Sequence, residues 1–157
     1  EAQVARFMIP ATLGYPDFAH ELAMAKSIGE RDRLDQVEPV MEREQLLDMQ
    51  REIHQIYMKD EIYQYIVRLI TATRNHPYLQ RGASPRATIA LVKMAKASAW
   101  LKGRDFVSPG DVQEQFAYVV AHRIDLNQAA KMGNVSKQEV MGEILKDTKR
   151  PPMGEKR

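Results

Sequence analysis

Gly82-Ala83-Ser84-Pro85-Arg86-Ala87 opens a strongly helical segment that runs to Lys102. Ser84 is a favourable N-cap because its hydroxyl can accept from a free backbone N–H, and Pro85 suits the first helical position, where no N–H is needed. Arg86 is therefore predicted on the first turn, where outward-pointing amides and the positive end of the helix macrodipole favour anions. Its planar guanidinium can bind phosphate oxygens in two places. The hexapeptide alone fits two interpretations, a phosphate-binding helix start and a capped surface helix with a solvated arginine.

The composition is that of an ordinary globular protein. The 157 residues are enough for one domain, or a domain with flanking pieces, and 28% of them are charged. Because the chain has no cysteine, a disulfide framework and a thiolate metal site are excluded. No apolar run has the length of a membrane span, and the first residues lack the pattern of a signal peptide. We therefore expect a cytoplasmic protein without membrane contact.

The positive charge is concentrated at the C-terminus. Residues 146–157 hold five Lys/Arg against two Asp/Glu, and the net charge of the whole chain is +2, so the remainder carries −1. One alternative function is a helical nucleic-acid-binding module that reads with the helix Ser108–Arg123 and uses the tail as an electrostatic arm. A reading helix needs basic or amide side chains on its outer face, yet residues 109–121 contain no Lys or Arg. A protein-interaction module without nucleotide chemistry is a second alternative.

Apolar residues recur at helical spacing over most of the chain. We expect a helix from Asp17 to Gly29, a charged loop over 30–39, and a second helix carrying Leu46 to Ile56. Further helices are expected from Asp60 to Asn75, from Pro85 to Lys102, from Ser108 to about Arg123, and from the capping-box pattern Ser136–Glu139 to Leu145.

Two short segments favour strands. Phe7–Gly14 is apolar but is interrupted by Pro10, which predicts an edge strand or the strand end of something larger. Ile56–Met58 is β-prone and is predicted to pair with Tyr78-Leu79 across the turn at His76-Pro77. The expected fold is mainly α, a helical bundle with at most a short β-hairpin, preceded by a remnant strand.

Motifs for independent catalysis are absent from the sequence. It contains no glycine-rich phosphate loop, no His-Glu-x-x-His pattern and no nucleophile elbow. The histidines lie far apart on different expected elements, so no metal site is predicted: His20, His54, His76 and His122.

A series of motifs resembles the C-terminal part of a MoxR-type AAA+ ATPase, a family related to the magnesium-chelatase ATPase subunits. The matches occur in family order and continue to about Leu145: Glu1–Phe7, Gly14–Pro16, Arg74–Pro77, Gly82–Ala87, Gly103–Val112 and Ala121–Arg123. The resemblance implies that residues 1–14 are the end of the α/β nucleotide-binding core, that residues 15–147 form a helical lid domain, and that residues 148–157 are a disordered basic tail.

The resemblance also implies roles for particular residues. Arg86 matches the sensor-2 arginine, which reaches the γ-phosphate of ATP held by the same subunit, with Ser84 and Pro85 beside it at the binding position. Arg6 matches the arginine finger, which reaches the nucleotide of a neighbouring subunit. At Ala5 the chain departs from the family, which usually has an acidic residue there.

The function that follows from the resemblance is that of a lid in a ring-shaped, chaperone-like remodeler. The expected partners are the protein's own AAA+ core, further copies in a homo-oligomeric ring, expected to be a hexamer, and a von Willebrand A-type protein or client complex. The full-length parent is expected to use ATP and Mg²⁺. This chain alone is expected to be inactive and to bind neither, because the family's phosphate loop, magnesium ligands and sensor 1 lie upstream of Glu1.

Overall fold

The computed structural model describes residues 3–28 and 37–152. The chain forms two compact units, one made of Glu1–Pro10 with Gln50–Arg157 and the other of Ala11–Met49. Most of the expected loop at 30–39 and the end of the expected tail lie outside the described residues. Within the described part of that tail, Pro151 is buried.

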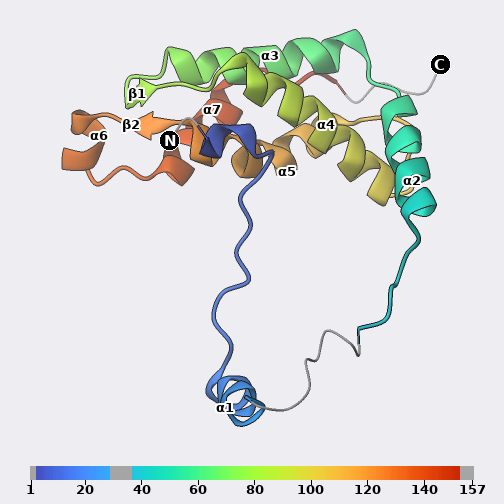
Figure 1. Ribbon diagram of the computed structural model, residues 1–157. Helices are drawn as coiled ribbons and strands as arrows, with labels where there is room; N and C mark the ends of the chain where they lie inside the picture. The colour runs from blue at the N-terminus through green and yellow to red at the C-terminus, as the bar shows by residue number, and fades with distance from the viewer. Residues whose placement is uncertain (1–2, 29–36, 153–157) are drawn as a thin grey trace. The chain divides into compact units, whose positions relative to one another are not determined.

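The larger unit is helical (Figure 1). Its longest helix is α4 (Pro85–Leu101), and α2 (Arg43–Gln55) belongs to this unit from Gln50 onward. The other helices are η1 (Val4–Arg6), α3 (Asp60–Arg74), α5 (Pro109–Val120), η3 (Ala121–Arg123), α6 (Gln128–Met132) and α7 (Lys137–Asp147). The helices α3 and α4 begin and end within a residue or two of the sequence predictions. The predicted helix from Ser108 to about Arg123 is α5 up to Val120 and then the short helix η3.

The core lies where α3 and α5 meet the alanine-rich face of α4, and α7 packs against α3 and α5. α3 buries the predicted stripe, including Ile66 and Leu69, and α5 contributes Phe116, which has no exposed surface. The buried residues of α4 are mostly small, so its backbone lies close to α5: Ala87, Ala90, Leu91, Ala95, Ser98 and Ala99. A fully buried side chain such as Phe116 stabilises the fold by about 1.5–3 kcal/mol.

The predicted pairing of Ile56–Met58 with Tyr78-Leu79 is wrong. The strand β1 (Leu79–Arg81) pairs antiparallel with β2 (Asp125–Leu126), far along the chain and not as a hairpin (Figure 1). Tyr57 instead forms an isolated parallel bridge with Phe106. The reason is the length of α3, whose 15 residues span about 22 Å and hold the two predicted partners at opposite ends.

The predicted strand at 7–14 is also absent from the structure. The chain makes the short helix η1 and then runs without ladder bonds from residue 9 to Asp17. Pro10 lacks an N–H, and no other strand lies beside this segment among residues 3–28 and 37–152.

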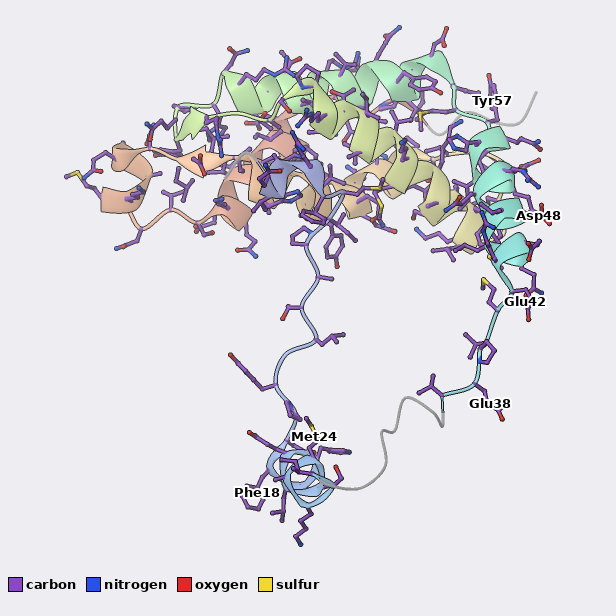
Figure 2. All side chains as sticks on the ribbon, viewed as in Figure 1. Phe18, Met24, Glu38, Glu42, Asp48 and Tyr57 are labelled. Carbon is purple, nitrogen blue, oxygen red and sulfur yellow. The ribbon has the colours of Figure 1, made fainter. Side chains whose placement is uncertain are left out.

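The smaller unit contains α1 (Phe18–Lys26). Asp17 caps it as predicted, its carboxylate accepting from the backbone N–H of His20 at 2.9 Å. No residue of α1 is buried, and the side chains of Phe18 and Met24 stand on it in the open (Figure 2).

The turn between α4 and α5 is held by one buried carboxylate. Asp111 receives two bonds from Arg104, at 2.5 and 2.8 Å, and others from Lys102 and from the N–H and hydroxyl of Ser108. Burial raises the pKa of Asp111, but these donors outweigh it and hold the pKa well below the usual range of an aspartate. The motif Gly103–Val112 is therefore a structural clamp that fixes the start of α5.

Candidate functional site

The position of Arg86 is set by the connection between α3 and α4. The backbone N–H of Ala83 donates to Thr73 Oγ1 at 2.9 Å, and Arg74 Nε donates to the carbonyl of Ala83 at 2.9 Å. A Cβ on Gly82 would lie 2.5 Å from the carbonyl oxygen of Thr73, so only glycine lets the chain pass this close. The first turn of α4 is thus fixed to the end of α3.

Ser84 is the N-cap of α4, as predicted, but its side chain makes no capping hydrogen bond. The N–H of Ala87, which a capping serine usually takes, donates instead to the backbone carbonyl of Ser84 at 2.9 Å. Pro85 occupies the first helical position as predicted. Arg86 follows it, exposed, and by helix geometry its own amide has no carbonyl partner within α4.

One cavity brings the two predicted arginines together. It has a volume of about 210 Å³ and lies within the larger unit, between α4, η1 and the end of η3. Its lining residues are Ala5, Arg6, Met8, Arg86, Ile89, Ala90, Lys93 and Arg123.

The polar side chains of this cavity all carry positive charge. Four cationic side chains line it and no carboxylate does: Arg6, Arg86, Lys93 and Arg123. Ala5, where the family resemblance implies an acidic residue, is itself part of the lining. Pockets for whole drug-sized ligands measure about 300–1,000 Å³, so this one suits an anion of the size of a phosphate group.

A second cavity, of about 450 Å³, has a different character. Its lining combines Trp100 with both signs of charge, including Glu52, Arg104 and Asp105. Trp100 Nε1 donates to Glu52 Oε2 at 2.9 Å, which joins the end of α4 to α2. With two carboxylates and one arginine, this lining offers no excess positive charge to a phosphate.

Arg123 connects the N-terminal segment to the end of α5. Its guanidinium donates to the carbonyls of Met8 and Phe7 at 3.0 and 2.6 Å, and also to the carbonyl of Val119. Burial lowers the pKa of Arg123, but an arginine stays protonated in proteins.

His122 contacts the same carbonyl. Its Nε2 lies 3.1 Å from the oxygen of Phe7 and donates to it. Burial lowers the pKa of His122, with Arg123 and Lys137 acting in the same direction, so the neutral imidazole is favoured. Arg6 therefore lies one residue before a backbone segment that two side chains hold.

Three further features of the described residues concern metal ions, membranes and nucleic acids. In residues 3–28 and 37–152, no group of three or more His, Asp or Glu side chains is placed to hold a metal ion. None of the described helices combines the length and the apolar character that crossing a bilayer requires. The outer face of α5, proposed as a nucleic-acid reader, carries no basic residue.

Comparisons with known proteins agree with this architecture. The AAA lid domain family matches residues 71–144. The chaperone MoxR1 of Mycobacterium tuberculosis is 29% identical over 96% of this chain and 42% of its own length. YeaC of Bacillus subtilis, an uncharacterized protein, is 36% identical over 96% of this chain and 47% of its own.

A solved structure shares the fold as well. The crystal structure of a protein of Cytophaga hutchinsonii that is assigned to the ATPases superposes with a TM-score of 0.79, at 31% identity, over 96% of this chain and 48% of that one. The chain belongs to the MoxR-type AAA+ lid domains. This lid chain spans about half the length of the curated relatives it matches.

Three features of the lid were not predicted from the sequence. Thr73 was predicted only as a stripe residue, Lys93 was not singled out, and Arg123 was noted only as part of a motif. The signal for Lys93 was its spacing, because it lies seven residues after Arg86 and hence on the same face of α4. Nothing local to Arg123 indicates that it reaches the backbone of residues 7 and 8.

Proposed function

We propose that this lid contributes Arg86, as a sensor-2 residue, and Arg6, which the resemblance matches to the arginine finger, to ATP hydrolysis in a ring-shaped, chaperone-like AAA+ assembly. The observation that carries the proposal is the cavity lined by Arg6, Arg86, Lys93 and Arg123 without a carboxylate. Four cations around an opening of this size would attract a polyanion, which supports the proposal.

The cavity favours one shared anion. The family resemblance assigns Arg86 to the nucleotide of its own subunit and Arg6 to that of a neighbour. Both side chains line one cavity in one chain, however, so they are suited to phosphate oxygens of the same nucleotide. We therefore propose that they act together.

Phosphoryl transfer requires little covalent catalysis by the protein. Phosphoryl transfer is accelerated mainly by positioning and by neutralising charge on the transferred group, and arginine does both. Arg86 and Arg6 would contact the phosphates, while ATP and Mg²⁺ would be held by parts of the full-length protein outside these 157 residues. The chain alone is proposed to hydrolyse no ATP.

Nucleotide state would then be coupled to lid position. A contact between Arg86 and the γ-phosphate exists before hydrolysis and is lost after it, so the two nucleotide states favour different lid positions. In this proposal a hexameric ring, acting in the cytoplasm with a von Willebrand A-type protein or another client, uses that movement.

The test uses the full-length protein that contains this lid. Arg86→Ala and Arg6→Ala should each lower ATP turnover by on the order of 10²-fold. The matched control is Arg68→Ala, which removes an exposed cation of α3 outside the cavity. Parental turnover in both cavity variants would reject the proposal.

Mixed rings then test whether the arginines share a nucleotide. Each variant is mixed with subunits whose phosphate loop is disabled, under conditions where subunits exchange. A shared nucleotide predicts the same behaviour for both variants, recovery of activity in both mixtures or in neither. Recovery with Arg6→Ala alone would show that the two arginines serve different nucleotides.

A further inference from the structure

Arg123 is the buried cation of the cavity. Its side chain is 5% exposed, and Nη1 donates to the carbonyls of Met8 and Val119 while Nη2 donates to that of Phe7. These bonds span the sequence from residue 7 to residue 123 and join the segment that carries Arg6 to the end of α5.

The guanidinium has little capacity left for a ligand. An arginine offers five N–H donors, and three of those of Arg123 are given to backbone carbonyls. Its Nε is buried without a partner among the described residues. One N–H of Nη2 remains, whereas Arg6 and Arg86 are both exposed on the cavity and make no side-chain hydrogen bond within residues 3–28 and 37–152.

We infer that Arg123 is a positioning residue, which fastens the Phe7–Met8 backbone to the end of α5 and thereby directs Arg6 into the cavity beside Arg86. The inference rests on the proposed function, in which Arg6 binds phosphate. Arg6 directly precedes the fastened residues, so loosening them frees the Arg6 side chain to sample positions outside the cavity.

Two neighbouring side chains can be compared with Arg123. His122 adds a second donor to the carbonyl of Phe7 and so shares the fastening. Lys137 donates to the carbonyl of Ala121 at 2.9 Å, at the same end of α5, but makes no hydrogen bond to residues 3–10. Lys137→Met is therefore a matched control that removes a cation from this region without breaking the hydrogen bonds to residues 7 and 8.

The first measurement is tryptic cleavage after Arg6 in the 157-residue chain, followed by mass spectrometry. Arg123→Lys keeps the charge but cannot reproduce the planar fork, so it should speed this cleavage at least tenfold. Lys137→Met should leave the rate unchanged. Cleavage after Arg68, within α3, reports global unfolding and should stay slow in both variants; an unchanged rate after Arg6 would overturn the inference.

The second measurement is the affinity for tripolyphosphate, determined by calorimetry. Arg123→Lys should weaken binding about fivefold or more although the charge is kept, and Arg6→Ala combined with Arg123→Lys should bind no more weakly than Arg6→Ala alone. Additive losses, or full affinity in Arg123→Lys when Arg6→Ala binds weakly, would overturn the positioning role.

Failure of the proposed function gives a different pattern. If Arg6→Ala and Arg86→Ala bind tripolyphosphate as the parent chain does, the cavity is not a phosphate site, and cleavage after Arg6 alone decides whether Arg123 fastens the segment. Should Arg123→Lys fail to fold, His122→Phe replaces it, because it removes one bond to Phe7 without a buried charge. In His122→Phe, the rate of cleavage after Arg6 and the affinity for tripolyphosphate should lie between those of the parent chain and those expected for Arg123→Lys. Parental values for both would overturn the inference.

Discussion

Thr73 and Ala83 join the end of one helix to the start of the next: the hydroxyl oxygen of Thr73, with no exposed surface, accepts from the N–H of Ala83 at 2.9 Å while donating to the carbonyl of Ile70 at 2.6 Å. Thr73→Val keeps the shape but leaves the Ala83 N–H without a partner. We expect a loss of about 1–3 kcal/mol in the free energy of unfolding, measured by urea denaturation. Thr73→Ser, which keeps the hydroxyl, should lose less than half as much; equal losses would assign the effect to the methyl group.

Gly82 should tolerate no larger residue. An added Cβ meets the backbone of Thr73 and Arg74 at 2.5–2.7 Å, so Gly82→Ala must push the start of α4 away from α3. In the full-length protein it should lower ATP turnover as well as stability. Gly142→Ala is the control, because its Cβ meets nothing within 4 Å and alanine favours a helix by roughly 0.5–1 kcal/mol. A stable, fully active Gly82→Ala protein would contradict this account.

The positive cavity should be stabilised by anions. Ligands that bind only the folded state raise its stability by mass action, so tripolyphosphate should raise the Tm of the chain more than chloride of equal ionic strength. Lys93→Met should reduce that rise and, by removing repulsion among the lining cations, slightly raise the Tm without anion. Arg68→Ala should change neither value, and a Tm that responds equally in all three proteins would argue against a specific site.

The ionised carboxylate of Asp111 should stabilise the fold from neutral pH down to a pH of about 4. Because its pKa is lowered in the folded state, its contribution is complete above the unfolded value of about 4 and is lost as the pH falls through the folded value. Asp111→Asn should cost about 3 kcal/mol at pH 7 by leaving Arg104 poorly paired, and less below pH 4. The control Glu114→Gln removes the exposed partner of Lys102 and should cost under about 1 kcal/mol. A cost for Asp111→Asn that does not change with pH would contradict the assignment.

His122 should make the fold less stable in acid. Its folded pKa is lowered, so its contribution is complete above the unfolded value of about 6.5 and is lost as the pH falls below that value, when the unfolded state binds the proton more readily. His122→Asn should flatten the dependence of the unfolding free energy on pH between about 7 and 5. The same slope in parent and variant would show that another group causes it.

Features that depend on neighbouring residues were predicted correctly from the sequence, whereas contacts between distant segments were not. The start of α5 at Ser108 and the capping box at Ser136 were predicted because a few neighbouring residues determine them. The pairing of β1 with β2 was missed because it joins residues 44 to 47 positions apart in the sequence, and the length of α3 was not used to exclude the wrong partner. The placement of Arg6 beside Arg86 was likewise beyond local pattern, since it depends on Arg123 contacting residues 7 and 8.

The alanine face of α4 has a mechanical consequence. Alanine has no side-chain rotamers, so Ala87, Ala90, Ala95 and Ala99 cannot absorb a displacement by repacking, as longer core side chains do. A pull on Arg86 from a bound phosphate would therefore move α4 as a stiff rod, and α5 would travel with it. The force would act on the start of α4. The hydrogen bonds of Asp111 at the other end of α4 would transmit it to the rest of the lid.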